Sequence, residues 1–457
     1  MSMTRNLVVG AAVVGAAYSG AAWYIGTKAE AEIQHQVAEF NAAAADYGAV
    51  QLNIVNYHRH WFSADINYEL LIDDGAEQHQ LLLEDKLRHG PLPAAALLRG
   101  RFAPLLAYSE LKLLPSQNVQ PWFDATKGLT PVAAHSFIDF NGSSKSQIDL
   151  AAVDYQNEFG EQLQMSAATL NVSYKTDTQA LALDAVLPDL AVVDAETETQ
   201  IQLKELRFDG HVLDSEQGQS SEGALRIQQA RVAMVDAVEV VVDTISAHST
   251  SELYGNLVDS ALHYDLAKVS IDGHDIGQIE LDLDFKRVNY EVLALLSQPE
   301  LMDDLSEAEL QPILEQFFSH QPELVIQPFS WRNAAGESQV TADLKMAATA
   351  ADTYPNNEVD LAHFFEALDI NASISRPMLQ ALFAEDGFSR SLVDMLFTQM
   401  AKKGQEAGLV VYDGSVASLQ LRFDAASQTL MLNGKPTDPN ELFYAWLALQ
   451  MGGGLMR

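Results

Sequence analysis

The chain contains no cysteine in 457 residues. This absence excludes disulfide scaffolds, cysteine nucleophiles, zinc sites with cysteine ligands and thiolate iron–sulfur clusters. It also fits an oxidising compartment, where unpaired thiols are a liability. Basic residues are scarce too, with 27 Lys and Arg against 63 Asp and Glu, which gives a formal net charge of −36. We therefore expect no nucleic-acid partner, because phosphate contacts need clustered Lys or Arg side chains.

Familiar catalytic and nucleotide-binding motifs are absent as well. The sequence holds no G-x-S-x-G, P-loop, G-x-G-x-x-G or EF-hand loop. Hydrophobic residues nevertheless make up 48% of the chain, which is not the composition of a disordered protein. The length also allows a sizeable core. The sequence thus predicts a large folded protein, with no cofactor and no metal, and more in keeping with binding than with catalysis.

The longest uncharged run lies at the N-terminus. Residues 7–26 (LVVGAAVVGAAYSGAAWYIG) would form a helix of about 30 Å, enough to cross a bilayer core. Arg5 precedes the run, and Trp23 and Tyr24 lie near its far end, where amphipathic rings prefer the membrane interface. No second run of this kind follows. The pattern predicts a cytoplasmic tail at residues 1–6, a single-pass inner-membrane anchor at 7–26 and a periplasmic body at 27–457.

Two further interpretations of this run stay open. A cleaved signal peptide is the alternative to an anchor, although the apolar run is longer than a usual signal core. Gly10, Gly15 and Gly20 give the span a small-residue surface, which can bring two spans together. A homo-oligomer is therefore a possible assembly.

Alternation of apolar and polar residues dominates the body. Between Phe62 and Ile72 every second residue is apolar, and a period of two predicts a half-buried strand. The pattern recurs over residues 163–174, 199–208, 224–242, 279–285, 340–346 and 368–374, and residues 417–423 and 428–432 predict a hairpin. Asp272-Gly273 and Asn141-Gly142 are turn signals. Together these features favour an extended, mainly antiparallel sheet with one covered face.

Helical spacing of apolar residues interrupts the strands in three places. Residues 289–321 predict two short helices, residues 378–405 predict a helical segment that Gly387 divides, and Asp438-Pro439 predicts a capped helix start. The predicted fold class is β-rich α+β, an extended sheet with helical inserts behind one transmembrane helix. One long body is favoured over two related sheet domains, with a weak boundary near residues 354–358.

Five motifs in order along the chain point to a family. They are AAWYIG at 21–26, NYHRHWFSADINYEL at 56–70, HGPLP at 89–93, SWRNAAGES at 330–338 and LMLNGKP at 430–436. In combination they make the chain resemble the YdgA-like family of bacterial inner-membrane proteins, a domain of unknown function. The resemblance covers nearly the whole chain and implies a single-span, periplasm-facing envelope protein of proteobacteria. It carries no established catalytic residues.

Histidines beside the first predicted strand form a candidate functional or structural motif. Its members are His58, Arg59, His60, Trp61, His89, Gly90 and Pro91. On a strand, His58 and His60 would share one face, and a metal would need further ligands such as His89. The structural interpretation is favoured, namely polar turns that anchor Trp61 and bend the chain. Most of the adjacent acids, a group that includes Glu84-Asp85, are interpreted as solvated strand faces and loop tips.

The remaining candidates are apolar. If the helical inserts cover the sheet only in part, a groove remains, and an exposed apolar patch usually marks a lipid or partner site. The candidate groove or lid residues are Phe317, Phe318, Phe364, Phe365, Leu396 and Phe397. The leading hypothesis is a binding module for a lipid-like apolar ligand or an envelope protein. The alternatives are a homo-oligomeric envelope scaffold and a carboxylate- or histidine-dependent envelope hydrolase.

Overall fold

The computed structural model describes residues 37–38, 41–42, 50–60, 63–73, 78–89, 94–103, 105–215, 218–234, 238–296, 306–348, 361–383 and 387–442. The chain divides into two compact units, residues 1–216 with 225–236 and residues 217–224 with 237–457. The expected transmembrane helix at 7–26 and the weak boundary at 354–358 both lie outside the described residues. Among the helices that the structure does describe, none is both long enough and apolar enough to cross a membrane.

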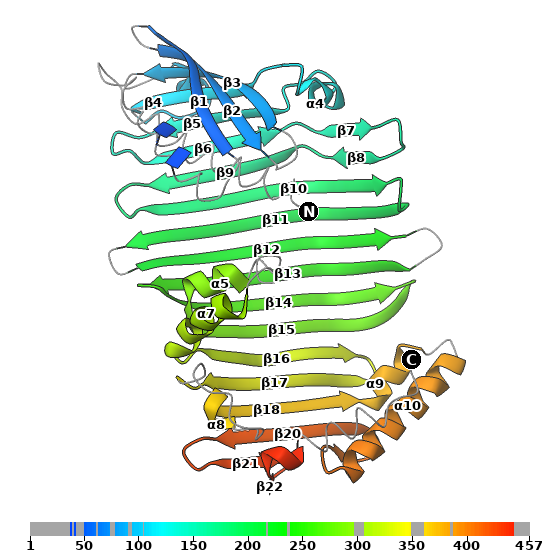
Figure 1. The fold of residues 1–457 in the computed structure, drawn as a ribbon. Helices are drawn as coiled ribbons and strands as arrows, with labels where there is room; N and C mark the ends of the chain where they lie inside the picture. Colours follow the sequence, from blue (N-terminus) through cyan, green and yellow to red (C-terminus); the bar gives the residue numbers. More distant parts are fainter. Residues whose placement is uncertain are drawn as a thin grey trace. The chain divides into compact units, whose positions relative to one another are not determined.

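The first unit is an antiparallel sheet in which most strands pair with the next along the chain (Figure 1). Its strands are β1 Val50–Arg59, β2 Ser63–Asp73, β3 Gln78–His89, β4 Ala107–Leu113, β5 Val132–Ile138, β6 Ser144–Leu150, β7 Val153–Gln156, β8 Gln162–Met165, β9 Ala168–Lys175, β10 Ala180–Asp194 and β11 Thr199–Ser215. The β7–β8 hairpin branches off, so that β6 pairs with β9, while β10 pairs with β8, β9 and β11. Helices α3 Ala94–Leu98 and α4 Gln120–Ala125 lie in the connections on either side of β4.

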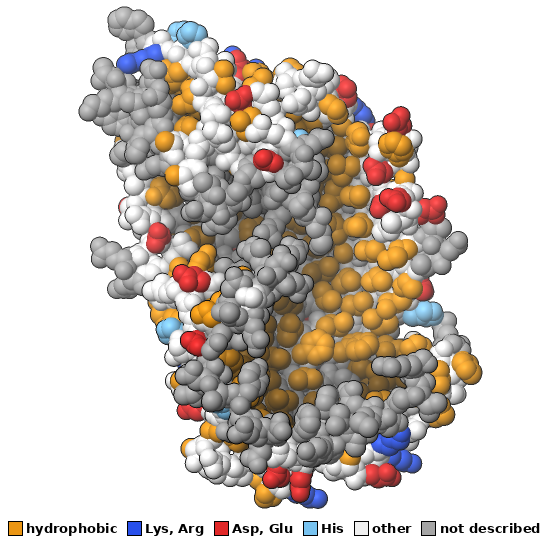
Figure 2. All heavy atoms as spheres, viewed as in Figure 1, with side chains coloured by type: hydrophobic (Ala, Val, Ile, Leu, Met, Phe, Trp, Pro, Cys, Tyr) orange, Lys and Arg blue, Asp and Glu red, His pale blue; other side chains and the backbone are white. Residues whose placement is uncertain are grey.

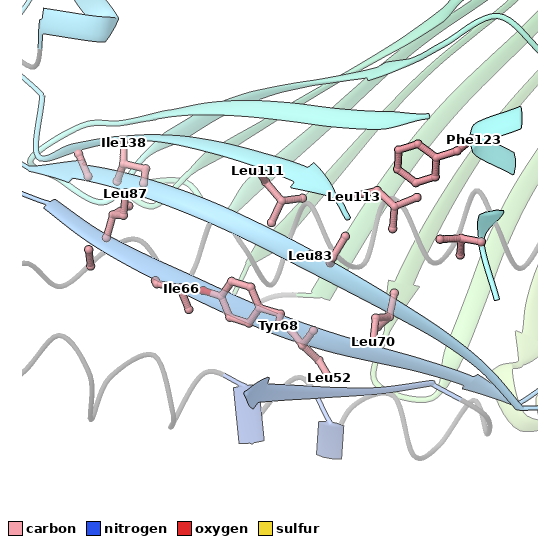
Figure 3. Packing of buried hydrophobic residues seen from close by; sticks show 13 residues of the cluster. Leu52, Ile66, Tyr68, Leu70, Leu83, Leu87, Leu111, Leu113, Phe123 and Ile138 are labelled. Atoms are coloured by element: carbon pink, nitrogen blue, oxygen red, sulfur yellow. The ribbon is translucent and has the colours of Figure 1, made fainter. Parts of the chain in front are cut away.

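A closed core lies on one face of β1 to β5 in the first unit. Alternate residues of β2, namely Ile66, Tyr68 and Leu70, are 1%, 4% and 3% exposed. Val119 and Phe123 of the α4 region belong to the same cluster. Figure 3 shows the side chains of this cluster, which come from β1 to β5 and from α4. The period-two pattern of residues 62–72 therefore corresponds to an observed strand with one buried face.

The second unit is also an antiparallel sheet. Its strands are β13 Glu239–Tyr254, β14 Leu257–Ile271, β15 His274–Asn289, β16 Glu323–Asn333, β17 Gly336–Met346, β18 Phe365–Ser375, β19 Val411–Tyr412, β20 Val416–Asp424, β21 Thr429–Leu432 and β22 Lys435–Pro436. They pair in chain order, except that β18 pairs with β20, which also carries β19. Helices α5 Tyr290–Leu296 and α7 Glu307–Ser319 separate β15 from β16, α8 Leu361–Phe364 precedes β18, and α9 Arg376–Ala381 and α10 Gly387–Glu406 follow it. Strand β12, Gly218–Ala233, has residues in both units.

The structure confirms a β-rich, antiparallel fold with helical inserts. Two segments expected as single strands are each two strands, since residues 163–174 form β8 and β9 and residues 224–242 lie in β12 and β13. The interruption between β8 and β9 has a local cause. Pro188 of β10 has no N–H to donate, so the ladder is interrupted there. Beside it, the Ser166 hydroxyl donates to the Asp189 carbonyl and accepts from the Asp189 N–H.

Candidate functional site

The sheet of the second unit has one apolar face and one charged face. On β15 the side chains Ile279, Leu281, Leu283 and Phe285 alternate with Glu280, Asp282, Asp284 and Lys286. Successive side chains of a strand point to opposite faces, so the two sets lie on opposite faces of the sheet.

The pairing of residues between strands shows that the apolar face of β15 continues onto the neighbouring strands. Residues directly opposite one another share a face, and Leu281 lies opposite Tyr264 on β14 and opposite Phe329 on β16. We call the resulting set the apolar face. It comprises Leu262, Tyr264 and Leu266 of β14, Ile279, Leu281, Leu283 and Phe285 of β15, Leu324, Ile326, Phe329 and Trp331 of β16, and Val340, Ala342 and Leu344 of β17. The side chains are apolar at every one of these positions, apart from the hydroxyl of Tyr264 and the indole N–H of Trp331.

The apolar face is not packed as a closed core. Tyr264 and Phe329 are 43% and 42% exposed, and most of its other members are half-buried. Figure 2 shows hydrophobic side chains crowded over the long strands, with acidic side chains at their margins. Trp331 places its polar edge against the backbone, because its indole N–H donates to the Ile276 carbonyl at 2.8 Å. The face therefore offers van der Waals contact to a ligand.

The last strands of the first unit repeat this arrangement. Register pairs Leu187 of β10 with Leu206 of β11, and Ala185 with Phe208, so these residues share a face. Ile201 and Phe208 are 38% and 36% exposed. A hollow of about 470 Å³ opens beside these strands, lined in part by Met165, Leu190 and Leu203 and in part by Ser166, Asp189 and Lys204. Both units thus carry an apolar strand face that stays partly open.

One carboxylate lies inside the closed core of the first unit. Asp85 of β3 is opposite Ile66 of β2 and Leu111 of β4 and is 1% exposed. The Ser109 hydroxyl donates to its Oδ1 at 2.6 Å. Burial, together with the Asp85 charge, raises the pKa of Tyr68 well above its ordinary value. The interpretation of Glu84-Asp85 as a solvated acidic face is therefore wrong for Asp85, because the strand alternation turns it inward.

Hydroxyl groups continue this buried polar row without forming a catalytic triad. Ser109 lies opposite Ser136, and the Ser136 and Ser146 hydroxyls are 2.7 Å apart. His135 is next to Ser136 in the chain and therefore points to the opposite face of β5. There, burial and then the nearby Arg99 lower the pKa of His135. His135 is thus not brought together with Asp85 and the serines. The buried hydroxyl groups of Ser109, Ser136 and Ser146 form hydrogen bonds within the core.

The predicted histidine motif lies at one end of β1. His58, Arg59 and His60 are exposed, and His60 Nε2 is 3.1 Å from Asp65 Oδ2. His58 lies opposite Asp65 of β2. Asp65 in turn lies opposite Lys86 of β3, three residues before His89. Trp61, Gly90 and Pro91 fall outside the described residues, so a function for this motif stays a prediction.

The candidate groove or lid residues occupy three separate places in the second unit. Phe317 and Phe318 lie on α7, with ring centroids 5.2 Å apart. Phe364 ends α8, and Phe365 begins β18 and packs against the buried cluster of Leu368, Phe423 and Leu430. Leu396 and Phe397 lie on α10, where the ring of Phe397 is 6.0 Å from that of Tyr412. Their role as a common lid stays a prediction.

Comparison with known proteins gives a family for this architecture. The chain matches, over residues 4–440, a family described as a bacterial protein of unknown function, DUF945. The chain belongs to the DUF945 family. This membership agrees with the YdgA-like resemblance of its motifs. No solved structure matches the chain.

Two relatives of this DUF945 chain come from Escherichia coli strain K12. Protein YdgA is 24% identical over 95% of both chains, and the uncharacterized protein YihF is 24% identical over 95% of this chain and 96% of its own. An uncharacterized protein of Haemophilus influenzae is 21% identical over 63% of this chain and 83% of its own. Similarity to YdgA and YihF thus extends over nearly the full length.

Sequence reasoning missed one group on the charged face of this DUF945 chain. His263 of β14 lies opposite Asp282 of β15, and its Nδ1 is 2.5 Å from Asp282 Oδ1. Ligand atoms of His263, Glu280 and Asp282 all lie within 4.8 Å of one another. The alternating acids at 280 and 282 were visible in the sequence. Their histidine neighbour depends on the strand register of β14 and β15, which shifts at three places, and a single sequence does not reveal these shifts.

Proposed function

We propose that this protein is a membrane-anchored binding module of the periplasm whose ligand is a lipid-like molecule with a long apolar chain. The observation that carries the proposal is the apolar face of β14 to β17. It is apolar at successive in-register positions on neighbouring strands, yet it remains partly open to solvent.

An acyl chain fits this surface better than a peptide does. The side chains of the apolar face supply almost no hydrogen-bonding groups, and a peptide laid on it would leave backbone N–H and C=O groups without partners. A peptide also cannot extend the sheet at these strands, because each of β14 to β17 already pairs on both sides. A hydrocarbon chain needs no such partners.

The hydrophobic effect supplies the driving force. Apolar surface removed from water contributes roughly 25 cal/mol per Å². Side chains such as Tyr264 and Phe329 leave about two-fifths of their surface exposed, and a ligand would cover part of it. The other face of β15 carries the half-buried carboxylates Glu280, Asp282 and Asp284. One sheet thus separates a charged side from a side suited to lipid.

The proposed anchor supports a lipid ligand. Residues 7–26 form an uncharged run of membrane-spanning length with Arg5 on its N-terminal side. As an inner-membrane anchor it would hold the sheet in the periplasm beside a lipid source.

Photo-crosslinking tests the proposal with two adjacent positions. Leu281→p-benzoylphenylalanine places the probe on the apolar face, and Glu280→p-benzoylphenylalanine is the matched control on the opposite face. The full chain is irradiated in membranes, purified and analysed by mass spectrometry. We expect a lipid adduct from position 281 and none from position 280, with both proteins equally resistant to protease.

A double variant tests whether the lipid adduct depends on an apolar surface around position 281. Phe329→Asp puts a carboxylate directly opposite Leu281, and combined with the probe at 281 it should abolish the lipid adduct. A protein adduct at position 281 would overturn the lipid proposal in favour of a protein partner. Equal lipid adducts at both positions, or none at either, would overturn it as well.

A further inference from the structure

We propose that His263, Glu280 and Asp282 form a binding site for a divalent transition-metal ion, with His248 as a fourth ligand. The site lies on the charged face of the second unit, so the inference does not rest on the proposed function of the apolar face.

The geometry brings imidazole and carboxylate groups together from neighbouring strands. The ligand atoms of His263, Glu280 and Asp282 lie within 4.8 Å of one another. Zinc binds imidazole nitrogen and carboxylate oxygen at about 2.0–2.2 Å, so ligand atoms around one ion lie about 3–4 Å apart. The side chains of His263 and Asp282 are 41% and 38% exposed. An ion can therefore enter from solvent, and small rotations of exposed side chains complete the site.

His248 is placed to supply a second imidazole. It lies on β13 directly opposite His263 of β14. Side chains at directly opposite positions have Cβ atoms about 4.5–5.5 Å apart. The Nε2 of His248 is 3.8 Å from Glu222 Oε1, so its ring already lies beside a carboxylate. A rotation of His248 toward His263 gives a set of two imidazoles and two carboxylates.

Carboxylates outnumber the cations around the site, where the charge of Arg332 also acts on Glu280. Glu280 lies opposite Asp265 on β14 and opposite Ser330 on β16. The Asp265 carboxylate accepts a hydrogen bond from the neutral Gln278 amide at 2.8 Å. Three carboxylates, those of Asp265, Glu280 and Asp282, thus adjoin His263, and a divalent ion would offset their mutual repulsion.

The donor types select the class of metal. Calcium and magnesium prefer sites built from oxygen alone, whereas imidazole nitrogen suits zinc, copper and nickel. A bound ion would link β13, β14 and β15 through their side chains. It would therefore stabilise the folded state, because binding to the folded form alone shifts the unfolding equilibrium.

Calorimetric titration of Zn²⁺ into the purified full chain in detergent tests the site. The comparison is between the unsubstituted chain, His263→Ala and the control His320→Ala, an exposed histidine after α7. We expect one saturable site in the first and third proteins. Loss of the His263 ligand should weaken binding at least about tenfold. The rise in thermal midpoint with Zn²⁺ should disappear in the same variant.

A second ligand variant and a second metal ion complete the test. Asp282→Asn replaces a ligand without changing side-chain volume and should also weaken Zn²⁺ binding if His263→Ala fails to fold. Ca²⁺ should bind far more weakly than Zn²⁺. Equal Zn²⁺ affinity in all proteins, equal affinity for the two ions, or the absence of any saturable binding would overturn the proposal.

Discussion

The first unit closes the inward face of β1 to β5, whereas the second unit leaves the apolar face of β14 to β17 half open. Ile66 in the first region is 1% exposed, while Phe329 in the second is 42% exposed. Both regions show the same alternation of apolar and polar residues. In the first, Val119 and Phe123 join the cluster. Alternation therefore gives a sheet one apolar face. The elements that pack on this face determine whether it becomes a buried core or remains an exposed surface.

Polar groups mark the same difference. In the closed region, Asp85 and Ser109 are buried and form a hydrogen bond with each other. A buried polar group that loses its partner costs free energy. At the edge of the open region, Ser249 of β13 lies opposite Leu262 and keeps access to water. The two regions should thus respond differently to equivalent substitutions.

The largest effect is expected from truncating an isoleucine. Ile66→Ala removes buried methyl groups and leaves a cavity, which should lower the free energy of unfolding by about 2–5 kcal/mol. Ile374→Ala makes the same change on β18 at a position 47% exposed, and should cost less than about 1 kcal/mol. Urea unfolding followed by circular dichroism measures both. Equal losses would break the distinction between a closed and an open face.

A serine pair should give the next largest difference. Ser109→Ala removes the hydroxyl that donates to Asp85 and leaves a buried carboxylate with one hydrogen bond fewer, which should cost about 1–3 kcal/mol. Ser249→Ala should change stability by no more than about 0.5 kcal/mol. The same unfolding measurement applies. A neutral Ser109→Ala would show that the buried carboxylate does not depend on this hydroxyl.

A pH effect should be smaller and confined to the first unit. Burial, and then Arg99, lower the pKa of His135 in the folded chain. The unfolded chain takes up this proton near pH 6.5, whereas the folded chain does not. The stability that His135 contributes is therefore complete above about pH 6.5 and is lost as the pH falls toward the lowered value.

The measurement is the slope of unfolding free energy between pH 7 and pH 5. We expect a shallower slope in His135→Gln than in the unsubstituted chain. His211→Gln, on the exposed surface of β11, is the control and should keep the original slope. A slope that is identical in all three proteins would contradict the assignment.

A small effect on stability, with a clear effect on binding, is expected on the apolar face itself. Phe329→Ser should cost only about 1 kcal/mol, because much of the ring is already in contact with water. It should nevertheless reduce the fluorescence of a bound apolar dye such as 1-anilinonaphthalene-8-sulfonate. Unchanged dye binding with full stability would show that the dye, and by analogy a ligand, does not use this face.

Sequence alone predicts the fold best where alternation is strict. Residues 279–285 show the period without exception and lie in β15. Strand β10 was not predicted from the sequence. Leu183 and Leu187 point to one face, but Ala182 and Val186 on the other face are also apolar, so the sequence shows no period of two. The helical inserts within residues 289–321 and 378–405 were predicted because the apolar spacing that marks a helix is local.

The candidate sites depend on information that is not local. The position of Asp85 between Leu83 and Leu87 indicates its inward direction, but adjacent acids in an acidic chain first suggest solvent. The His263–Asp282 contact joins residues on two strands whose register shifts at bulges. How far the apolar face is covered depends on packing between distant segments, and no local pattern encodes it.

The even spacing of strands has a consequence for how a ligand would move. Neighbouring strands lie about 4.8 Å apart, and β14, β15 and β16 present similar aliphatic and aromatic groups at matching positions. A hydrocarbon chain displaced sideways by one strand would exchange one set of contacts for a nearly equivalent set. The binding energy would then vary little with position, so that lateral diffusion across the sheet would meet low barriers while escape into water would remain unfavourable.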